Sequence, residues 1–313
     1  GRHDIDPTAI LAPFYFLFFG LMLSDAAYGL ILTTLCAIIL KKYKPEGTTH
    51  RMIKMFMFCG LSTFMWGALF GGWFGNFFTV AAKTFFGKEF VIRPLWFDPL
   101  SEPMRLLVVS LILGAIHLFV GMGVQAYMDI KDGRPLDALF DIGLWYLLLI
   151  GIVLFAFGGK LGAGAVGIGK IMAIVGAVGI LLTGGRKKKG IFGKLTGGLG
   201  SLYGITSYLS DVLSYSRLLA LGLATGVVAQ VFNTLGSLAG GGIAGSILLI
   251  VVFAFGTVFN IAINALGAFV HSCRLQYVEF FGKFYTGGGR PFAPFERKTK
   301  YIKILKEGND NVK

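Results

Sequence analysis

Seven long apolar stretches constrain this chain more than any other feature. Their approximate limits are 10–40, 53–81, 104–127, 138–157, 163–183, 201–235 and 243–281. The chain has 313 residues, of which 55% are hydrophobic and 14% charged, and its mean hydropathy is +0.73. A soluble domain of this size could not bury so much apolar surface, whereas a bilayer core accommodates helices of about 20 apolar residues. The sequence therefore predicts an all-α, polytopic membrane fold.

The charged residues gather in the loops between these stretches. The net charge of +13 would suggest a nucleic-acid partner in a soluble protein, but no such partner is expected here. Segments 41–54, 186–194 and 283–313 carry five, five and eight Lys or Arg, whereas 158–163 and 236–242 carry one and none. The positive-inside rule therefore places 41–54, 129–135, 184–194 and the C-terminus in the cytoplasm. The three cysteines lack CxxC spacing, and neither a metal nor a cofactor is expected.

Three of the apolar stretches are too long for one perpendicular crossing. The first would span about 46 Å as a helix, against a hydrocarbon core of about 30 Å. Ser24 and Asp25 at its middle suit a helix break. One tilted helix and a broken pair over residues 7–43 both remain open; the pair is favoured, and gives about eight membrane helices with both termini cytoplasmic. The last two stretches would run about 52 and 58 Å, so they are expected to tilt steeply.

An arginine lies deep inside each of the last two stretches, Arg217 in the sixth and Arg274 in the seventh. An arginine near the bilayer centre costs at least about 2.5–3.5 kcal/mol, and such residues usually face a cavity, an ion path or a carboxylate. The nearby carboxylates, Asp211 and Glu279, lie towards helix ends, where Glu279 is expected to be solvated. The partner of the arginines is therefore expected in another subunit.

The sixth stretch carries a stripe of hydroxyl groups that ends at its arginine. Tyr203, Ser207, Ser210, Ser214 and Arg217 follow one another at spacings of four and three residues, which is one helix face. With the arginine at its end, this face predicts a wet path rather than a helix–helix contact. Asp211 lies about 120° away around the helix; it faces the same cavity or bonds a neighbouring helix, and both remain open.

The seventh stretch repeats this pattern. Its predicted polar face is made of Asn260, Asn264, Gly267, His271, Arg274 and Val278. By the charge-based topology, the serine stripe opens towards the cytoplasm and the two asparagines lie in the opposite half of the membrane. Polar paths from opposite sides, staggered about two arginines, predict two offset half-channels.

Three sequence motifs stand out: PFYFLFFGLMLSDAAYG at 13–29, SDVLSYSRLLALGLA at 210–224 and HSCRLQYVEFFGKFY at 271–285. With these motifs the chain resembles the membrane domain of subunit a, also called subunit I, of V-type and archaeal A-type rotary ATPases. The resemblance extends from about residue 7 to 295. One departure is that eukaryotic relatives carry a glutamate where this chain has Asn264, which favours a prokaryotic type and a prokaryotic plasma membrane.

The resemblance implies a role for each arginine and a set of partners. Arg217 matches the arginine that is indispensable for ion translocation, and Arg274 the one that supports it. Residues 1–295 would form the ion-translocating domain, with 201–281 facing a membrane ring of small c- or K-type subunits, and 296–313 a basic cytoplasmic tail. Peripheral-stalk and central-stalk subunits would be further partners, and ATP hydrolysis would take place in other subunits. The family's N-terminal cytoplasmic domain is absent from this chain, and the coupling ion would be H⁺ or Na⁺.

A different class of protein also places arginines in a membrane cavity. Secondary transporters use them to bind anionic substrates, but such proteins are commonly built from internal repeats. The stretches before residue 160 contain no counterpart of the two arginine-bearing stretches. This alternative is therefore kept second.

Overall fold

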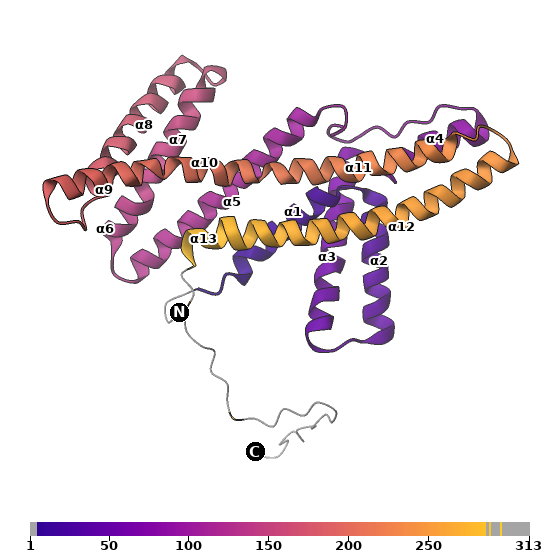
Figure 1. Ribbon diagram of the computed structural model, residues 1–313, viewed down its shortest axis with the longest axis horizontal. Coiled ribbons are helices and arrows are strands. Elements are labelled where there is room, and N and C mark those ends of the chain that lie inside the picture. The colour runs from indigo at the N-terminus through magenta and orange to yellow at the C-terminus, as the bar shows by residue number, and fades with distance from the viewer. Residues whose placement is uncertain (1–4, 286–287, 289–294, 296–313) are drawn as a thin grey trace, which may run out of the picture.

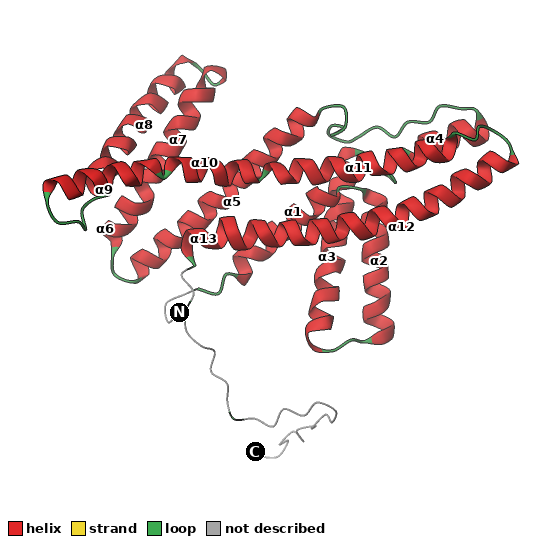
Figure 2. Ribbon diagram, in the orientation of Figure 1, coloured by secondary structure: helices red, strands yellow, loops and turns green. Residues whose placement is uncertain are grey.

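A computed structural model describes residues 5–285 together with 288 and 295, and in this part of the chain every regular element is helical (Figure 2). The predicted tail at 296–313 lies outside the described residues. The elements up to the middle of the chain are α1 (Thr8–Leu23), α2 (Ala26–Tyr43), α3 (Gly47–Phe70), α4 (Phe77–Phe86), α5 (Pro103–Lys131), α6 (Pro135–Ala138), the π-helix η1 (Leu139–Gly143) and α7 (Leu144–Phe157). They are followed by the 3₁₀ turn η2 (Gly158–Lys160), α8 (Ala163–Thr183), α9 (Ile191–Tyr203), α10 (Ile205–Ser214), α11 (Ser216–Ser237), α12 (Ile243–Arg274), the π-helix η3 (Leu275–Phe280) and α13 (Phe281–Phe284).

Seven helices in the described residues are long and apolar enough to cross a membrane, by length and composition. They are α2, α3, α5, the run Pro135–Lys160, α8, the run Ile191–Ser237 and the run Ile243–Phe284. The prediction of an all-α polytopic membrane fold is thus confirmed. Helix α1 is shorter, with 16 residues, and its last six residues, Phe18–Leu23, are all buried. Their apolar side chains belong to the principal core, to which α3, α5, α11 and α12 also contribute.

The first apolar stretch consists of two helices that separate at Ser24 and Asp25. Ser24 adopts the left-handed conformation with φ 30°, which ends α1. The Asp25 carboxylate accepts hydrogen bonds from the backbone N–H groups of Ala27 and Tyr28, at 3.0 and 3.2 Å, and thereby caps α2. These bonds satisfy N–H groups that the first turn of a helix leaves free.

The second apolar stretch, 53–81, is also interrupted. Helix α3 ends at Phe70, Gly71 follows in the left-handed conformation with φ 73°, and α4 begins only at Phe77. The interruption has a partner, because Phe74 N–H and Gly75 N–H donate to the Asp25 carboxylate at 3.1 and 2.9 Å. Treating 53–81 as one apolar segment was therefore wrong: the Gly71–Asn76 turn is shaped to reach the break between α1 and α2.

Two long rods form the C-terminal half of the described chain. The α9–α11 rod spans 47 residues from Ile191 to Ser237, and the α12–α13 rod spans 42 residues from Ile243 to Phe284. At 1.5 Å per residue each exceeds 60 Å, about twice a hydrocarbon core. In Figure 1 α11 and α12 lie side by side and cross the direction of α2 and α3 at a large angle. The expectation of two long C-terminal helices is confirmed, and the rods are longer than their apolar stretches because they extend into flanking residues.

Helices α7 and α8 form a hairpin whose close packing depends on glycine. A Cβ atom on Gly169 would lie 2.5 Å from the Phe155 backbone nitrogen, and one on Gly176 would lie 2.7 Å from the Leu148 nitrogen. Small residues of this kind let membrane helices approach at backbone distance. Gly167, two residues before Gly169 on α8, has no neighbouring atom within 4 Å of its Cβ position.

This pair of glycines provides a matched test of the hairpin. We expect Gly169→Ala to lower the apparent unfolding free energy by about 1–3 kcal/mol, because the methyl group overpacks the α7 backbone. Gly167→Ala should be neutral or stabilise by up to about 1 kcal/mol, since alanine favours a helix. Thermal unfolding of the two purified variants measures the difference. Equal midpoints for both variants would contradict the packing described here.

Candidate functional site

The buried stripe of α12 decides which polar residues of the seventh stretch point inward. Buried residues recur at every fourth position: Gly256, Asn260, Asn264, Ala268, Ser272 and Gln276. Such a row drifts by about 40° per step around the helix, and it is the ridge used when two helices cross at a marked angle. The predicted single face from Asn260 to Val278 is therefore wrong as a unit. Asn260 and Asn264 are buried, His271 is half-buried, and Arg274 and Val278 are exposed.

The two buried asparagines form a polar seam between α2, α11 and α12. The Asn260 side-chain amide donates to the Tyr28 hydroxyl at 2.9 Å and to the Thr225 carbonyl oxygen at 3.0 Å. Asn264 in turn donates to the carbonyl oxygen of Asn260 at 3.2 Å. Because buried polar groups need such partners, the seam fixes how α11 and α12 sit against the start of α2.

A cavity of about 230 Å³ lies beside the break between α1 and α2. Its polar lining includes Asp25, Asn76 and Gln230, and α11 contributes Gly222 and Gly226. The Asp25 carboxylate is 3% exposed and receives four backbone N–H groups. Gly222 follows Arg217 by five residues, an axial rise of about 7.5 Å. The cavity therefore ends within two helical turns of the arginine.

Arg217 forms an ion pair inside the protein. Its Nη1 lies 3.6 Å from Glu279 Oε1; the Arg217 side chain is 28% exposed and the Glu279 side chain 3%. Glu279 is thus not the solvated charge expected from the sequence, and the arginine has a counter-charge within its own chain. Arg217 Nη1 and Glu279 Oε2 are both buried without a hydrogen-bond partner among the described residues. The pair is an electrostatic contact with donor and acceptor capacity left over.

A second ion pair lies beside the first, between Lys283 and Asp211. The Lys283 ammonium also lies 4.2 Å from the centre of the Tyr208 ring, where a cation is attracted by the ring's face. Of the two alternatives for Asp211, the structure selects a bond to a neighbouring helix, α13. Two ion pairs therefore join the α9–α11 rod to the C-terminal end of the α12–α13 rod.

The hydroxyl stripe of the sixth stretch faces outward from this chain. Tyr203, Ser207 and Ser210 are exposed, and Ser214 is half-buried and donates to the Ser210 carbonyl oxygen at 3.1 Å. The stripe does not form a closed path within the described residues. It reaches Arg217 along an open surface of the rod.

A buried hydrogen-bonded chain next to the arginine pair was missed in the sequence. His117 of α5 is fully buried; its Nδ1 lies 2.6 Å from the Tyr215 hydroxyl and its Nε2 lies 3.1 Å from Gln276 Oε1. Gln276 and Glu279 both belong to the π-helix η3, whose extra residue in the turn changes which side chains point inward. A histidine in the middle of the apolar stretch 104–127 was the available signal.

These contacts define a class of protein: a helical membrane protein with an arginine ion pair between two long rods and a polar cavity to one side. Residues 205–297, which contain both arginines, match the model of the V-type ATPase 116kDa subunit family. This match and the relatives described next confirm the resemblance found in the sequence.

The relatives align with almost the whole chain. The A-type ATP synthase subunit I of Thermococcus kodakarensis is 38% identical over 312 residues, covering 97% of this chain and 45% of that protein. The protein of the same name in Methanocaldococcus jannaschii is 35% identical over 330 residues, covering 96% and 46%. The V-type ATP synthase subunit I of Borreliella burgdorferi is 24% identical over 322 residues, covering 96% and 50%. The chain spans about half the length of these curated relatives.

A double-mutant cycle tests the ion pair between Arg217 and Glu279. Glu279→Ala should destabilise the wild-type protein more than it destabilises the Arg217→Ala variant, because in the wild type it leaves the guanidinium without its counter-charge. We expect a coupling of about 0.5–2 kcal/mol in thermal unfolding, since Arg217 is partly screened by its exposure. Arg134→Ala is the control, because Arg134 belongs to a different set of ion pairs and its effect should add to that of Glu279→Ala. Additivity in both cycles would show that the pair contributes nothing.

Proposed function

We propose that this chain is the ion-translocating membrane region of the stationary subunit of a V/A-type rotary ATPase, with no catalytic site of its own. The position of Arg217 carries the proposal. Its guanidinium is paired with Glu279, and Gly222, five residues further along the same helix, lines a polar cavity. The names of the relatives, subunit I of A-type and V-type ATP synthases, support the same role.

The proposed partner is a ring of small membrane subunits, each with one ion-binding carboxylate. A carboxylate neutralised by H⁺ or Na⁺ can face lipid, whereas a bare one cannot, so the ring turns only when its sites are filled. Beside the guanidinium of Arg217 the ionised form is favoured and the cation is released. The contact with Glu279 is 3.6 Å long and leaves buried polar atoms unsatisfied, so Arg217 can exchange this partner for a ring carboxylate. Arginine suits the role because it stays charged when it is buried.

Two half-channels would serve the ring site from opposite sides. The cavity beside Asp25 and the buried Asn260–Asn264 seam together are the proposed outer path. The exposed hydroxyl stripe that leads to Arg217 is the proposed inner path, closed towards the ring only in the assembled complex. Arg217 would prevent a direct leak between the two, because a fixed positive charge repels a passing cation. Either direction of rotation, and either H⁺ or Na⁺, is compatible with this scheme.

Ion transport by assembled complexes tests the role of Arg217. We expect Arg217→Ala, Arg217→Gln and Arg217→Lys to abolish ion uptake that is coupled to ATP turnover, while the complex still assembles. Arg274→Ala should retain part of the transport, because a second cation tunes the interface without being the barrier. Uptake into vesicles is compared with ATPase activity of the same preparations. Wild-type transport in an intact Arg217→Ala complex would refute the mechanism.

The proposed orientation places both termini and the basic loops in the cytoplasm of a prokaryotic cell. Lys41–Lys54 and Arg186–Lys194 would lie on the cytoplasmic face, and the 236–242 loop on the other. Single cysteines introduced at Lys188 and Gly241 should therefore react with an impermeant thiol reagent from opposite sides of sealed vesicles. The natural cysteines are buried or half-buried, which keeps the background low. Labelling of both positions from the same side would overturn this layout.

A further inference from the structure

The loop between α8 and α9 carries a dense group of cations at the end of a membrane-spanning helix. Helix α8 ends at Thr183, and the loop that follows contains Lys187, Lys188 and Lys189 in succession. These three lysines and Lys194 on α9 are exposed. No ion pair joins Lys188, Lys189 or Lys194 to an acidic side chain among the described residues.

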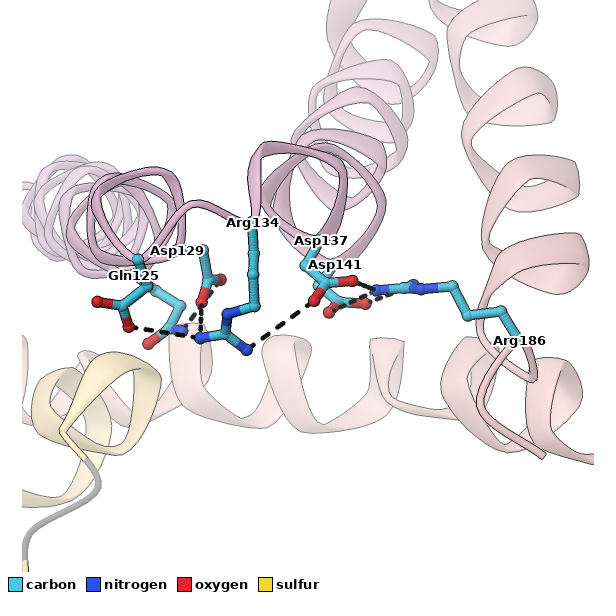
Figure 3. A network of polar contacts seen from close by, with 7 residues as sticks. Gln125, Asp129, Arg134, Asp137, Asp141 and Arg186 are labelled. Atoms are coloured by element: carbon cyan, nitrogen blue, oxygen red, sulfur yellow. Dashed lines mark hydrogen bonds and ion pairs between the residues drawn. The ribbon is translucent and has the colours of Figure 1, made fainter.

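The acidic groups next to this loop are already engaged by arginines (Figure 3). Arg186 contacts Asp137 at 2.6 Å and Asp141 at 2.9 Å, while Arg134 contacts Asp129 at 3.3 Å. The hydrogen bonds that Arg186 donates to the carboxylates of Asp141 and Asp137 raise the pKa of its guanidinium above the ordinary value, so this anchor stays charged. Arg186 thus fastens the loop to α6 and η1 and uses the acidic groups that could otherwise neutralise the lysines.

The loop folds back on α9 and brings its lysines together. Gly185 sits against the backbone of Lys194 so closely that a Cβ atom there would overlap the Lys194 carbonyl group. The Lys188 side chain crosses α9 at Gly197, where a Cβ atom would lie 3.2 Å from Lys188 Cδ. The Lys188 side chain therefore packs against the part of α9 that carries Lys194, between Gly193 and Gly197.

Two large apolar side chains stand directly beside the lysines. Ile191 and Phe192, the first residues of α9, are 90% and 80% exposed. A cationic group beside exposed aliphatic and aromatic side chains is the composition of a membrane-interface anchor, in which the apolar groups enter the acyl boundary and the cations stay at the headgroups. A soluble acidic partner would not require the apolar pair.

We propose that Lys188, Lys189 and Lys194, with Ile191 and Phe192, form a binding site for the headgroup of an anionic phospholipid. The phosphate diester lies among the ammonium groups, and the acyl chains lie against Ile191 and Phe192. The site is at the membrane boundary because α8, which leads into it, is one of the apolar helices long enough to cross a membrane. Near an anionic surface each lysine strengthens binding about fivefold, which corresponds to about 1 kcal/mol. Arg186 acts as a positioning residue, because it holds the loop and does not touch the lipid.

Photolabelling of the full subunit in its assembled complex tests this site. The complex is placed in nanodiscs with trace photoactivatable phosphatidylglycerol or, in parallel, photoactivatable phosphatidylcholine, and labelled peptides are identified by mass spectrometry. We expect phosphatidylglycerol to label the peptide around 188–195 at least about tenfold more than phosphatidylcholine does. Replacing Lys188, Lys189 and Lys194 with Gln should reduce this labelling to the phosphatidylcholine level, and Arg at the same three positions should preserve it.

The matched control removes the same charge from another basic loop. Lys41, Lys42 and Lys44 are exposed at the turn between α2 and α3, and changing them to Gln should leave labelling at 188–195 unchanged. An equal loss in this control would reduce the site to general surface attraction and overturn the proposal. Competition by excess free inorganic phosphate would also overturn it, since the occupant would then be a soluble anion. The labelling pattern does not depend on ion transport, so its failure is distinct from failure of the proposed function.

Discussion

The buried carboxylate of Asp25 is the interaction on which the rest of this structure depends. It gathers four backbone N–H groups, two from the first turn of α2 and two from the turn at Phe74 and Gly75. Burying a carboxyl group without hydrogen-bond partners costs free energy, and these four bonds supply the partners. The same contacts start α2 and draw the α3–α4 turn towards the break that follows α1. The polar cavity exists because these interrupted helices meet at one point.

At the other end of the site, a π-helix determines which polar side chains of the α12–α13 rod point inward. The buried row of α12 advances by four residues per step and therefore winds around the helix. In η3 both Gln276 and Glu279 are buried, which brings one to His117 and the other to Arg217. The extra residue of a π turn changes which side chains face inward without interrupting the rod, and π turns are often found at functional sites. Arg274, just before η3, remains on the exposed side.

Around the α8–α9 loop, charge is divided between arginines that join helices and lysines that remain at the surface. Arg134 and Arg186 each contact more than one carboxylate, as a planar guanidinium with several donors can do. Lysines of the neighbouring loop are exposed. Arg217 belongs to neither group, since it pairs with a single carboxylate, that of Glu279 at 3.6 Å. This incomplete pairing is what distinguishes it as the functional residue of the proposed mechanism.

The sequence by itself determined the membrane-protein class and the resemblance to V-type and A-type subunit I, and it singled out Arg217 as the candidate functional residue. Hydropathy identifies spans because lipid cannot satisfy a free backbone, and the Ser24–Asp25 pair marks a helix break through local capping chemistry. Only the tertiary structure decided that Glu279 is buried against Arg217, that Asp211 pairs with Lys283 and that Arg274 is exposed. A helical wheel assigns a fixed angle to each residue of a straight helix. The packing of α12 against α11 and the π turn at η3 change which of its side chains are buried. Contacts such as His117 with Tyr215, 98 residues apart, follow from the crossing of helices, which no local pattern contains.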